Sequence, residues 1–296
     1  MSAVRNLNAQ AKLRLERARA RHGWLDVLLT TFKRFSDEDG GFYAAGLTYY
    51  IFFSVFPLVL FAVSALGFAV FLSDSFRQDF IEAGREAFPL MTQVLQRDTL
   101  QRVENARFSL AAIGLLLGLY SGTGGIVALE HALNRIRGLE EGGTFVQRRL
   151  RALRFLATMG LIPLLSVTLG AVGQLVDSAP VGVVAYAGGA IMSVLLFACA
   201  FRFLPALKPP WREVLPGAIV AGAIFEALKL VGPLYLAAGR SNRDATFGTF
   251  ATAAGLLVSA YLLSQVTLLA AELNAVLAER RRSREFSLAD QDKEAP

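Results

Sequence analysis

The chain has 296 residues, of which 54% are hydrophobic and 18% are charged, and its formal net charge is +6. Its apolar residues form continuous stretches of about twenty or more, long enough to cross the ~30 Å of hydrocarbon in a bilayer, which excludes an ordinary soluble domain. One cysteine and two histidines exclude a disulfide framework and weigh against a histidine-rich metal site, so we expect no metal and no other cofactor. The composition predicts an all-α integral membrane protein.

Residues 1–45 form a polar, basic N-terminal segment that lacks the short apolar core of a cleaved secretory signal. Within it, residues 24–35 place apolar side chains on one face of a helix: Trp24, Leu25, Leu28, Phe32 and Phe35. This pattern predicts an amphipathic helix at the cytoplasmic membrane interface, and a cytosolic helix packed on the bundle is the alternative. We expect Gly40 and Gly41 to bend the chain into the first span.

Six apolar stretches predict a six-helix transmembrane bundle over residues 46–278. The approximate spans are 46–72, 108–129, 153–176, 181–204, 214–238 and 246–278. The last exceeds a simple crossing, so we expect it to tilt or to extend into the cytoplasm. Apolar periodicity in residues 74–107 predicts a helical periplasmic loop between the first two spans. Residues 279–296 are predicted to form a basic, disordered cytoplasmic tail.

The distribution of basic residues predicts the orientation. Of the 30 Lys and Arg residues, 20 lie in the two termini and in segments 130–152 and 205–213, whereas seven lie in the alternate loops. By the positive-inside rule, both termini face the cytoplasm. The net charge therefore reflects topology, and we do not expect nucleic-acid binding. One basic cluster is predicted to meet anionic lipid headgroups: Arg280, Arg281, Arg282 and Arg284.

Glycines at a spacing of four follow one face of the second span: Gly114, Gly118 and Gly122. Such a stripe lets another helix pack closely. Two interpretations stay open, namely tight packing alone or a moving helix that lines a substrate path.

Pro57 lies inside the first span, where it removes a backbone hydrogen bond and predicts a kink. In a membrane the freed carbonyl must find a partner or line a wet cavity. Tyr49, Tyr50 and Ser54 lie within two turns and could supply hydroxyl groups to that cavity. An ordinary interfacial position of the tyrosines is the alternative.

The intramembrane charges are the main candidates for a binding site. Glu226 and Lys229 lie near the middle of the fifth span, where each charge costs about 2.5–3.5 kcal/mol on insertion scales. Their spacing places both on one helical face, so we expect an ion pair that points into the bundle and serves either transport or structure. Glu130 and Glu272 lie near cytoplasmic helix ends, where pairing with arginines is the alternative to a functional role.

Four segments together suggest a known family: AAGLTYYIFFSVFPLVLFAVSALG (44–67), ALEHALNRI (128–136), WREVLPGAIVAGAIFEALK (211–229) and FGTFATAAGLLVSAYLLSQVTLLAAELNAVLAER (247–280). In content and order they resemble the YihY/BrkB family of bacterial inner-membrane proteins. Ser259 and Ala270 depart from the family, in which members often carry tryptophan and glycine at these positions.

The resemblance implies a six-helix protein of the bacterial inner membrane, linked in some members to virulence, serum resistance or lipid and envelope export. The family has also carried the label ribonuclease BN. A nuclease of that kind needs a histidine-rich metal cluster, which His22 and His131 do not provide.

These observations predict a transporter of a small solute or a lipid-like envelope substrate, with a midplane cavity walled by the first, second, fifth and sixth spans and no enzymatic activity. Glu226 would bind a proton, a cation or a cationic substrate group, and Lys229 would keep it ionised or meet an anionic group. Pro57 and the pair Gly232 and Pro233 are candidate hinges. A scaffold for envelope machinery is the second possibility, and a tRNA-processing ribonuclease is the third. The substrate, a coupling cation and the oligomeric state stay open.

Overall fold

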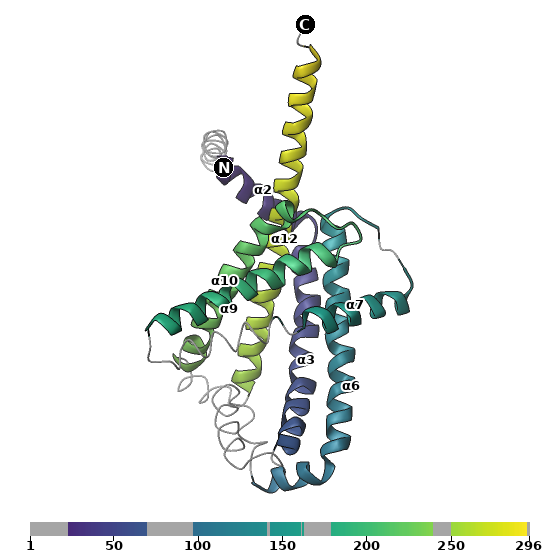
Figure 1. Ribbon diagram of the computed structural model, residues 1–296, viewed down its shortest axis with the longest axis vertical. Helices are drawn as coiled ribbons and strands as arrows, with labels where there is room; N and C mark the ends of the chain where they lie inside the picture. The colour runs from purple at the N-terminus through teal and green to yellow at the C-terminus, as the bar shows by residue number, and fades with distance from the viewer. Residues whose placement is uncertain are drawn as a thin grey trace, which may run out of the picture.

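The computed structural model describes residues 23–69, 97–140, 143–160, 162, 179–238 and 250–294. Every regular element in these ranges is an α-helix, which confirms the all-α prediction for the described part of the chain. The helices are α2 (Gly23–Asp37), α3 (Gly40–Ala69), α6 (Arg97–Ile136), α7 (Phe145–Met159), α9 (Ala179–Phe203), α10 (Trp211–Ala238) and α12 (Phe250–Glu294). Figure 1 shows α3 and α6 as long neighbours, with α9, α10 and α12 beside them.

Among the described residues, four helical stretches are long and apolar enough to cross a membrane: Ala112–Ile136, Gly182–Phe203, Trp211–Val231 and Ala253–Ser287. They correspond to the expected spans 108–129, 181–204, 214–238 and 246–278. The expected spans 46–72 and 153–176 both run into residues outside the described ranges. The total of six therefore stays a prediction, although α3 is helical from Gly40 to Ala69.

Two segments differ from the sequence prediction. Residues 97–107 were expected in a separate loop, but they form the first turns of α6, which is 40 residues long. The tail was expected to be disordered, but α12 continues to Glu294, so that residues 279–294 are helical. An anchored helix extends without a new nucleation step, and the Arg, Glu, Leu and Ala residues of this tail favour propagation. The remainder of the expected loop, 74–96, lies outside the described residues.

The turn between α2 and α3 depends on Asp39, whose φ of 57° lies in the left-handed region. Its carbonyl oxygen accepts hydrogen bonds from the N–H groups of Phe42 and Tyr43, which begins α3. The expectation that Gly40 and Gly41 supply the bend is therefore wrong in detail, because both already belong to α3. Gly40 is needed for space, since a Cβ there would overlap the Phe35 ring.

The contact between α3 and α6 is closest where Tyr50 meets Gly124. A Cβ on Gly124 would lie 2.5 Å from Cε1 of the Tyr50 ring, whereas a Cβ on Gly118 would lie 3.7 Å from Pro57, an ordinary van der Waals distance. The hydroxyl of Ser121 donates to the Tyr50 carbonyl oxygen across the same interface. The glycine that this contact requires most thus lies two residues beyond Gly122, the last glycine of the predicted stripe.

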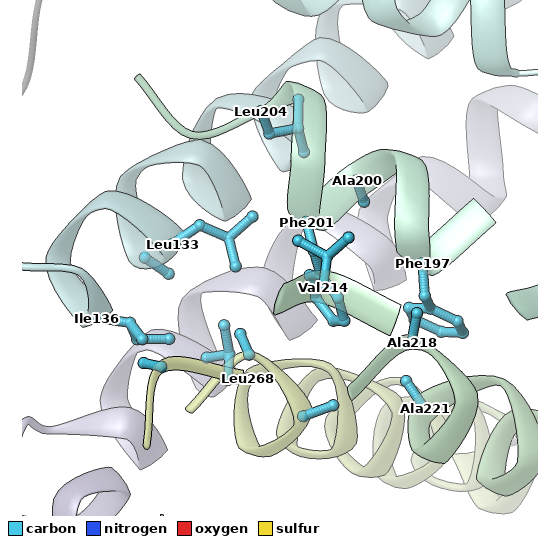
Figure 2. Packing of buried hydrophobic residues seen from close by; sticks show 14 of the residues in the cluster. Leu133, Ile136, Phe197, Ala200, Phe201, Leu204, Val214, Ala218, Ala221 and Leu268 are labelled. Atoms are coloured by element: carbon cyan, nitrogen blue, oxygen red, sulfur yellow. The ribbon is translucent and has the colours of Figure 1, made fainter. Parts of the chain in front are cut away.

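The buried core joins α3, α6, α9, α10 and α12. Figure 2 shows Phe201 from α9 and Val214 from α10 lying together, with Leu133 from α6 and Leu268 from α12 nearby. Many other members of this cluster are alanines, which permit the close helix approach that stabilises membrane bundles. This core lies at the end of the bundle where α6 and α9 end and α10 begins (Figure 1).

Candidate functional site

The ion pair expected on α10 is present. Lys229 Nζ lies 2.6 Å from Glu226 Oε1, at the helical spacing of three. The side chains are 21% and 12% exposed, respectively, so both charges are largely withdrawn from the surface. Lys229 Nζ also lies 5.2 Å from the centre of the Phe225 ring, a cation–π distance.

A third polar group completes this site from the neighbouring helix. The hydroxyl of Ser193 on α9 donates to Glu226 Oε1 at 2.5 Å, and Ser193 is fully buried. One carboxylate oxygen therefore accepts from both a hydroxyl and an ammonium group. We call Ser193, Glu226 and Lys229 the α9–α10 polar site.

Gly222 lets the two helices approach closely enough for this contact. A Cβ on Gly222 would lie 2.6 Å from Val194 Cγ2 and 3.1 Å from the Val194 backbone nitrogen. Gly222 precedes Glu226 by one helical turn and Val194 follows Ser193, so the close approach and the hydrogen bond lie on the same interface. The sequence prediction placed the pair against the kinked first helix, whereas its described hydrogen-bond partner comes from α9.

Glu130 and Glu272 are buried and paired with arginines, at 6% and 1% side-chain exposure. Glu130 Oε1 lies 3.0 Å from an Arg151 guanidinium nitrogen on α7. Glu272 Oε2 lies 3.5 Å from Arg34 Nε on α2, and it has no hydrogen-bond partner within the described residues. These two carboxylates tie peripheral helices to the bundle, which is the structural alternative stated above.

Arg34 is shared among three carboxylates. Its Nη1 donates to both oxygens of Glu279, at 2.8 and 2.7 Å, and its other nitrogens lie 3.5 Å from Glu38 and from Glu272. This network joins α2 to α12. Burial works against the charged form of Arg34, but the carboxylates outweigh it and raise the pKa of this guanidinium, so the positive charge at the junction is permanent.

The hydroxyl-bearing candidates on α3 do not join the α9–α10 polar site in the described contacts. Ser54 donates to the Ile51 carbonyl oxygen of its own helix at 2.7 Å. Tyr49 is 58% exposed and packs on the rings of Tyr50 and Phe53. Tyr50 itself covers Gly124.

The remaining packing and hinge candidates lie within helices. Pro57 is inside α3, and Gly114, Gly118 and Gly122 are inside α6. α10 continues through Gly232 and Pro233 to Ala238, and the side chains at these two positions lie outside the part of the chain that the structure describes.

Asn274 was not among the residues predicted from the sequence. It is 1% exposed and connects α12 to α10. Its Oδ1 accepts from the Gly217 N–H at 2.7 Å, and its Nδ2 donates to the Val214 carbonyl oxygen at 3.1 Å. Pro216 has no N–H to donate to the Arg212 carbonyl, and that oxygen accepts from Arg281 Nη1 instead, at 3.0 Å. The available signal was Pro216 in the first turns of α10, which leaves the Arg212 carbonyl oxygen without its usual helical donor.

The described residues line three cavities beside the C-terminal half of α12. One of 310 Å³ is lined by Arg137, Glu213 and Arg282 among others, and two of 520 and 440 Å³ lie along α12 beside α2. Neither Glu226 nor Lys229 lines any of them. In the part of the chain that the structure describes, no three His, Cys, Asp or Glu side chains are grouped to hold a metal ion.

Comparison with known proteins gives a consistent result. The profile of a family described as Virulence factor BrkB matches residues 31–295. YfkH of Bacillus subtilis, whose name calls it ribonuclease-like, is 22% identical over 87% of this chain and 97% of its own length. The inner membrane protein YhjD of Escherichia coli is 26% identical over 82% of this chain and 78% of its own length. A UPF0761 membrane protein of Azotobacter vinelandii is 30% identical over 88% of this chain and 65% of its own length. No solved structure matches the chain.

Proposed function

Because the chain belongs to the Virulence factor BrkB family of membrane proteins, we propose that it is a multi-pass inner-membrane transporter whose α9–α10 polar site takes part in moving its substrate. The observation that carries this proposal is the shared Oε1 of Glu226, which holds both Lys229 and Ser193 inside a helix pair apolar enough to span a membrane.

Charged side chains in the hydrocarbon of a bilayer carry a large free-energy cost. Each charge at a helix centre costs about 2.5–3.5 kcal/mol on insertion scales, so two would weaken insertion of α10 markedly. Apolar side chains of similar volume would fill the same space without this cost, and buried ion pairs replaced in this way often leave a protein as stable or more stable. Charged groups retained in a membrane span are therefore functional candidates by default.

The geometry indicates how such a site would work. Lys229 is one helical turn from Glu226, so movement of its side chain would expose a carboxylate that Ser193 still holds in place. The carboxylate would then take a proton, a cation or a cationic group of a small solute or lipid-like substrate. Return of Lys229 would release that cation, because the two compete for the same oxygen.

The test is reconstitution into proteoliposomes with a screen of solute classes under proton and sodium gradients. We expect wild-type protein to accelerate the flux of one class, and we expect folded E226Q/K229M protein to lose that flux. S193A should reduce the rate and S259A should not, because within the described residues the Ser259 hydroxyl bonds to its own helix, at the Gly255 carbonyl oxygen. Wild-type flux in E226Q/K229M would reject the proposed role of the pair.

A scaffold for envelope machinery is the second candidate. The specific observation in its favour is that Glu226 is held by Lys229 and Ser193, an arrangement that would also lock the packing of α9 on α10. A scaffold predicts that E226Q/K229M retains the in vivo phenotype of the wild type, whereas a transporter predicts that this variant behaves as a deletion.

A further inference from the structure

A groove runs between α2 and the C-terminal half of α12, with a cavity volume of about 520 Å³. Its wall is apolar and comes from both helices: Trp24, Val27, Leu28, Leu273 and Leu277. Its rim carries the guanidinium groups of Arg280, Arg281 and Arg284. No carboxylate belongs to the described lining, so the groove is apolar inside and positive at its edge.

The apolar side of α2 continues outward from this groove. Trp24, Leu28 and Phe32 follow one another at a spacing of four and are 60%, 41% and 57% exposed. The adjoining face of α2, which turns toward the bundle, holds Thr31, which is buried, and Arg34, which binds Glu279. A helix that is anchored by its polar face and presents aromatic and leucine side chains outward is suited to the boundary between headgroups and acyl chains.

The three arginines at the rim differ in the partners that their guanidinium groups have. Arg280 forms an ion pair with Asp26 of α2, so its charge is already compensated. Arg281 is exposed and uses one nitrogen, Nη1, for the Arg212 carbonyl oxygen. Arg284 is exposed, and it has no hydrogen bond or ion pair to the described part of the chain. Two guanidinium groups therefore retain donors for an anion at the edge of an apolar groove.

We propose that this groove binds one anionic phospholipid, with an acyl chain against Trp24, Leu28 and Leu277 and the phosphate on Arg281 and Arg284. A hydrocarbon chain matches the apolar wall, and a phosphodiester matches the planar guanidinium donors. The basic N-terminal segment of the chain is a poor occupant, because residues 1–22 contain six Lys and Arg residues that a positive rim repels. The site is separate from the α9–α10 polar site and does not depend on the transport proposal.

Arg282 is the matched control for this site. It lies on the same turn of α12, but its Nη2 points to the other side, 3.7 Å from Glu213 Oε1, and it lines the separate 310 Å³ cavity. Its side chain is 69% exposed, so its replacement removes one exposed positive charge from the same basic cluster of α12. If the basic tail attracts anionic lipid only diffusely, replacing Arg282 or Arg284 should weaken lipid binding equally. If a defined site exists, only the replacement of Arg284 should weaken it.

The experiment uses Trp24 as the reporter. The chain has two tryptophans, so W211F leaves Trp24 alone. The full-length W211F protein is placed in nanodiscs that contain brominated phosphatidylglycerol or brominated phosphatidylcholine at increasing mole fraction, and quenching of Trp24 fluorescence is recorded. We expect half-maximal quenching at a several-fold lower fraction of phosphatidylglycerol.

R284Q in this background should reduce the preference for phosphatidylglycerol about five-fold, the factor expected for one arginine near an anionic surface. R282Q should leave the preference unchanged. Equal quenching by the two lipids, or equal loss in R282Q and R284Q, would overturn the proposal. As a control, the thermal unfolding temperature of both variants is measured in detergent. A value equal to that of the W211F protein shows that both variants are folded.

Discussion

The backbone N–H of Gly217 donates to Asn274 Oδ1 at 2.7 Å, across the contact between α10 and α12. This bond lies beside Pro216, which interrupts the backbone hydrogen-bond pattern in the first turns of α10. The same asparagine donates to the Val214 carbonyl oxygen. One amide side chain therefore bonds two backbone groups of α10 and ties α12 to the first turns of that helix.

We predict that N274L destabilises the protein, because it removes two hydrogen bonds between α10 and α12, from the Gly217 N–H and to the Val214 carbonyl oxygen, at a position that is 1% exposed. A hydrogen bond of this kind contributes about 0.5–1.5 kcal/mol, so the loss of both should lower the free energy of unfolding by about 1–3 kcal/mol. Thermal unfolding in detergent would measure the loss. T267V is the matched control on α12, since in the described part of the chain the Thr267 hydroxyl bonds to the Leu263 carbonyl oxygen of its own helix. Equal stability of N274L and T267V would contradict the assigned role of Asn274.

We predict that G217A is poorly tolerated and that G118A is nearly neutral. A Cβ on Gly217 would overlap the Ala270 carbonyl oxygen and would lie 2.6 Å from Asn274 Nδ2, and a backbone carbonyl cannot rotate away. Overpacking of this kind costs about 1–3 kcal/mol. A Cβ on Gly118 would meet Pro57 at 3.7 Å. The yield and unfolding temperature of the purified variants test the prediction, and a stable G217A with an unstable G118A would reverse it.

We predict that removing one member of the Glu226–Lys229 pair is worse for stability than removing both. A single buried charge without its partner costs about 3–5 kcal/mol, whereas the double replacement leaves none. K229M should be the more harmful single change, because the shorter Glu226 side chain reaches water less easily than the long lysine stem. Unfolding temperatures of E226Q, K229M and E226Q/K229M provide the measurement. A double variant less stable than either single variant would show that the pair stabilises packing.

The orientation of the protein is a prediction from charge distribution. Reporter fusions after residues 90 and 142 should report opposite sides of the membrane, with residue 142 cytoplasmic, because 20 of the 30 basic residues lie in the segments assigned to that side. Activity of an alkaline phosphatase fusion at residue 90 and of a cytoplasmic reporter at residue 142 would be the expected pair of results. The same reporter active at both positions would reject the topology.

We predict that the purified protein does not cleave RNA in the presence of Mg²⁺ or Zn²⁺. Its buried carboxylates Glu130 and Glu272 are engaged by arginines, so they are poorly placed to bind a metal ion. The assay is a tRNA precursor incubated with protein from stringent purification. Cleavage that survives purification and is abolished in E130Q or E272Q would contradict the prediction.

The sequence determined what depends on composition and on short-range geometry. Long apolar stretches specify membrane helices because only internally bonded backbone is stable in hydrocarbon. Residues three apart meet on one helical face, so the Glu226–Lys229 pair followed from spacing alone. The family resemblance likewise came from local segments, and the profile match over residues 31–295 confirms it.

Tertiary structure decided which helix each polar group meets. Ser193 was one of several serines in apolar helices, and only the approach of α9 at Gly222 brings it to Glu226. Arg34 reaches Glu272 and Glu279 across more than two hundred residues of chain, and Asn274 reaches Gly217 across 57. Such partners depend on how helices rotate and pack against one another, and periodicity within a single helix carries no information about the angle at which a distant helix arrives.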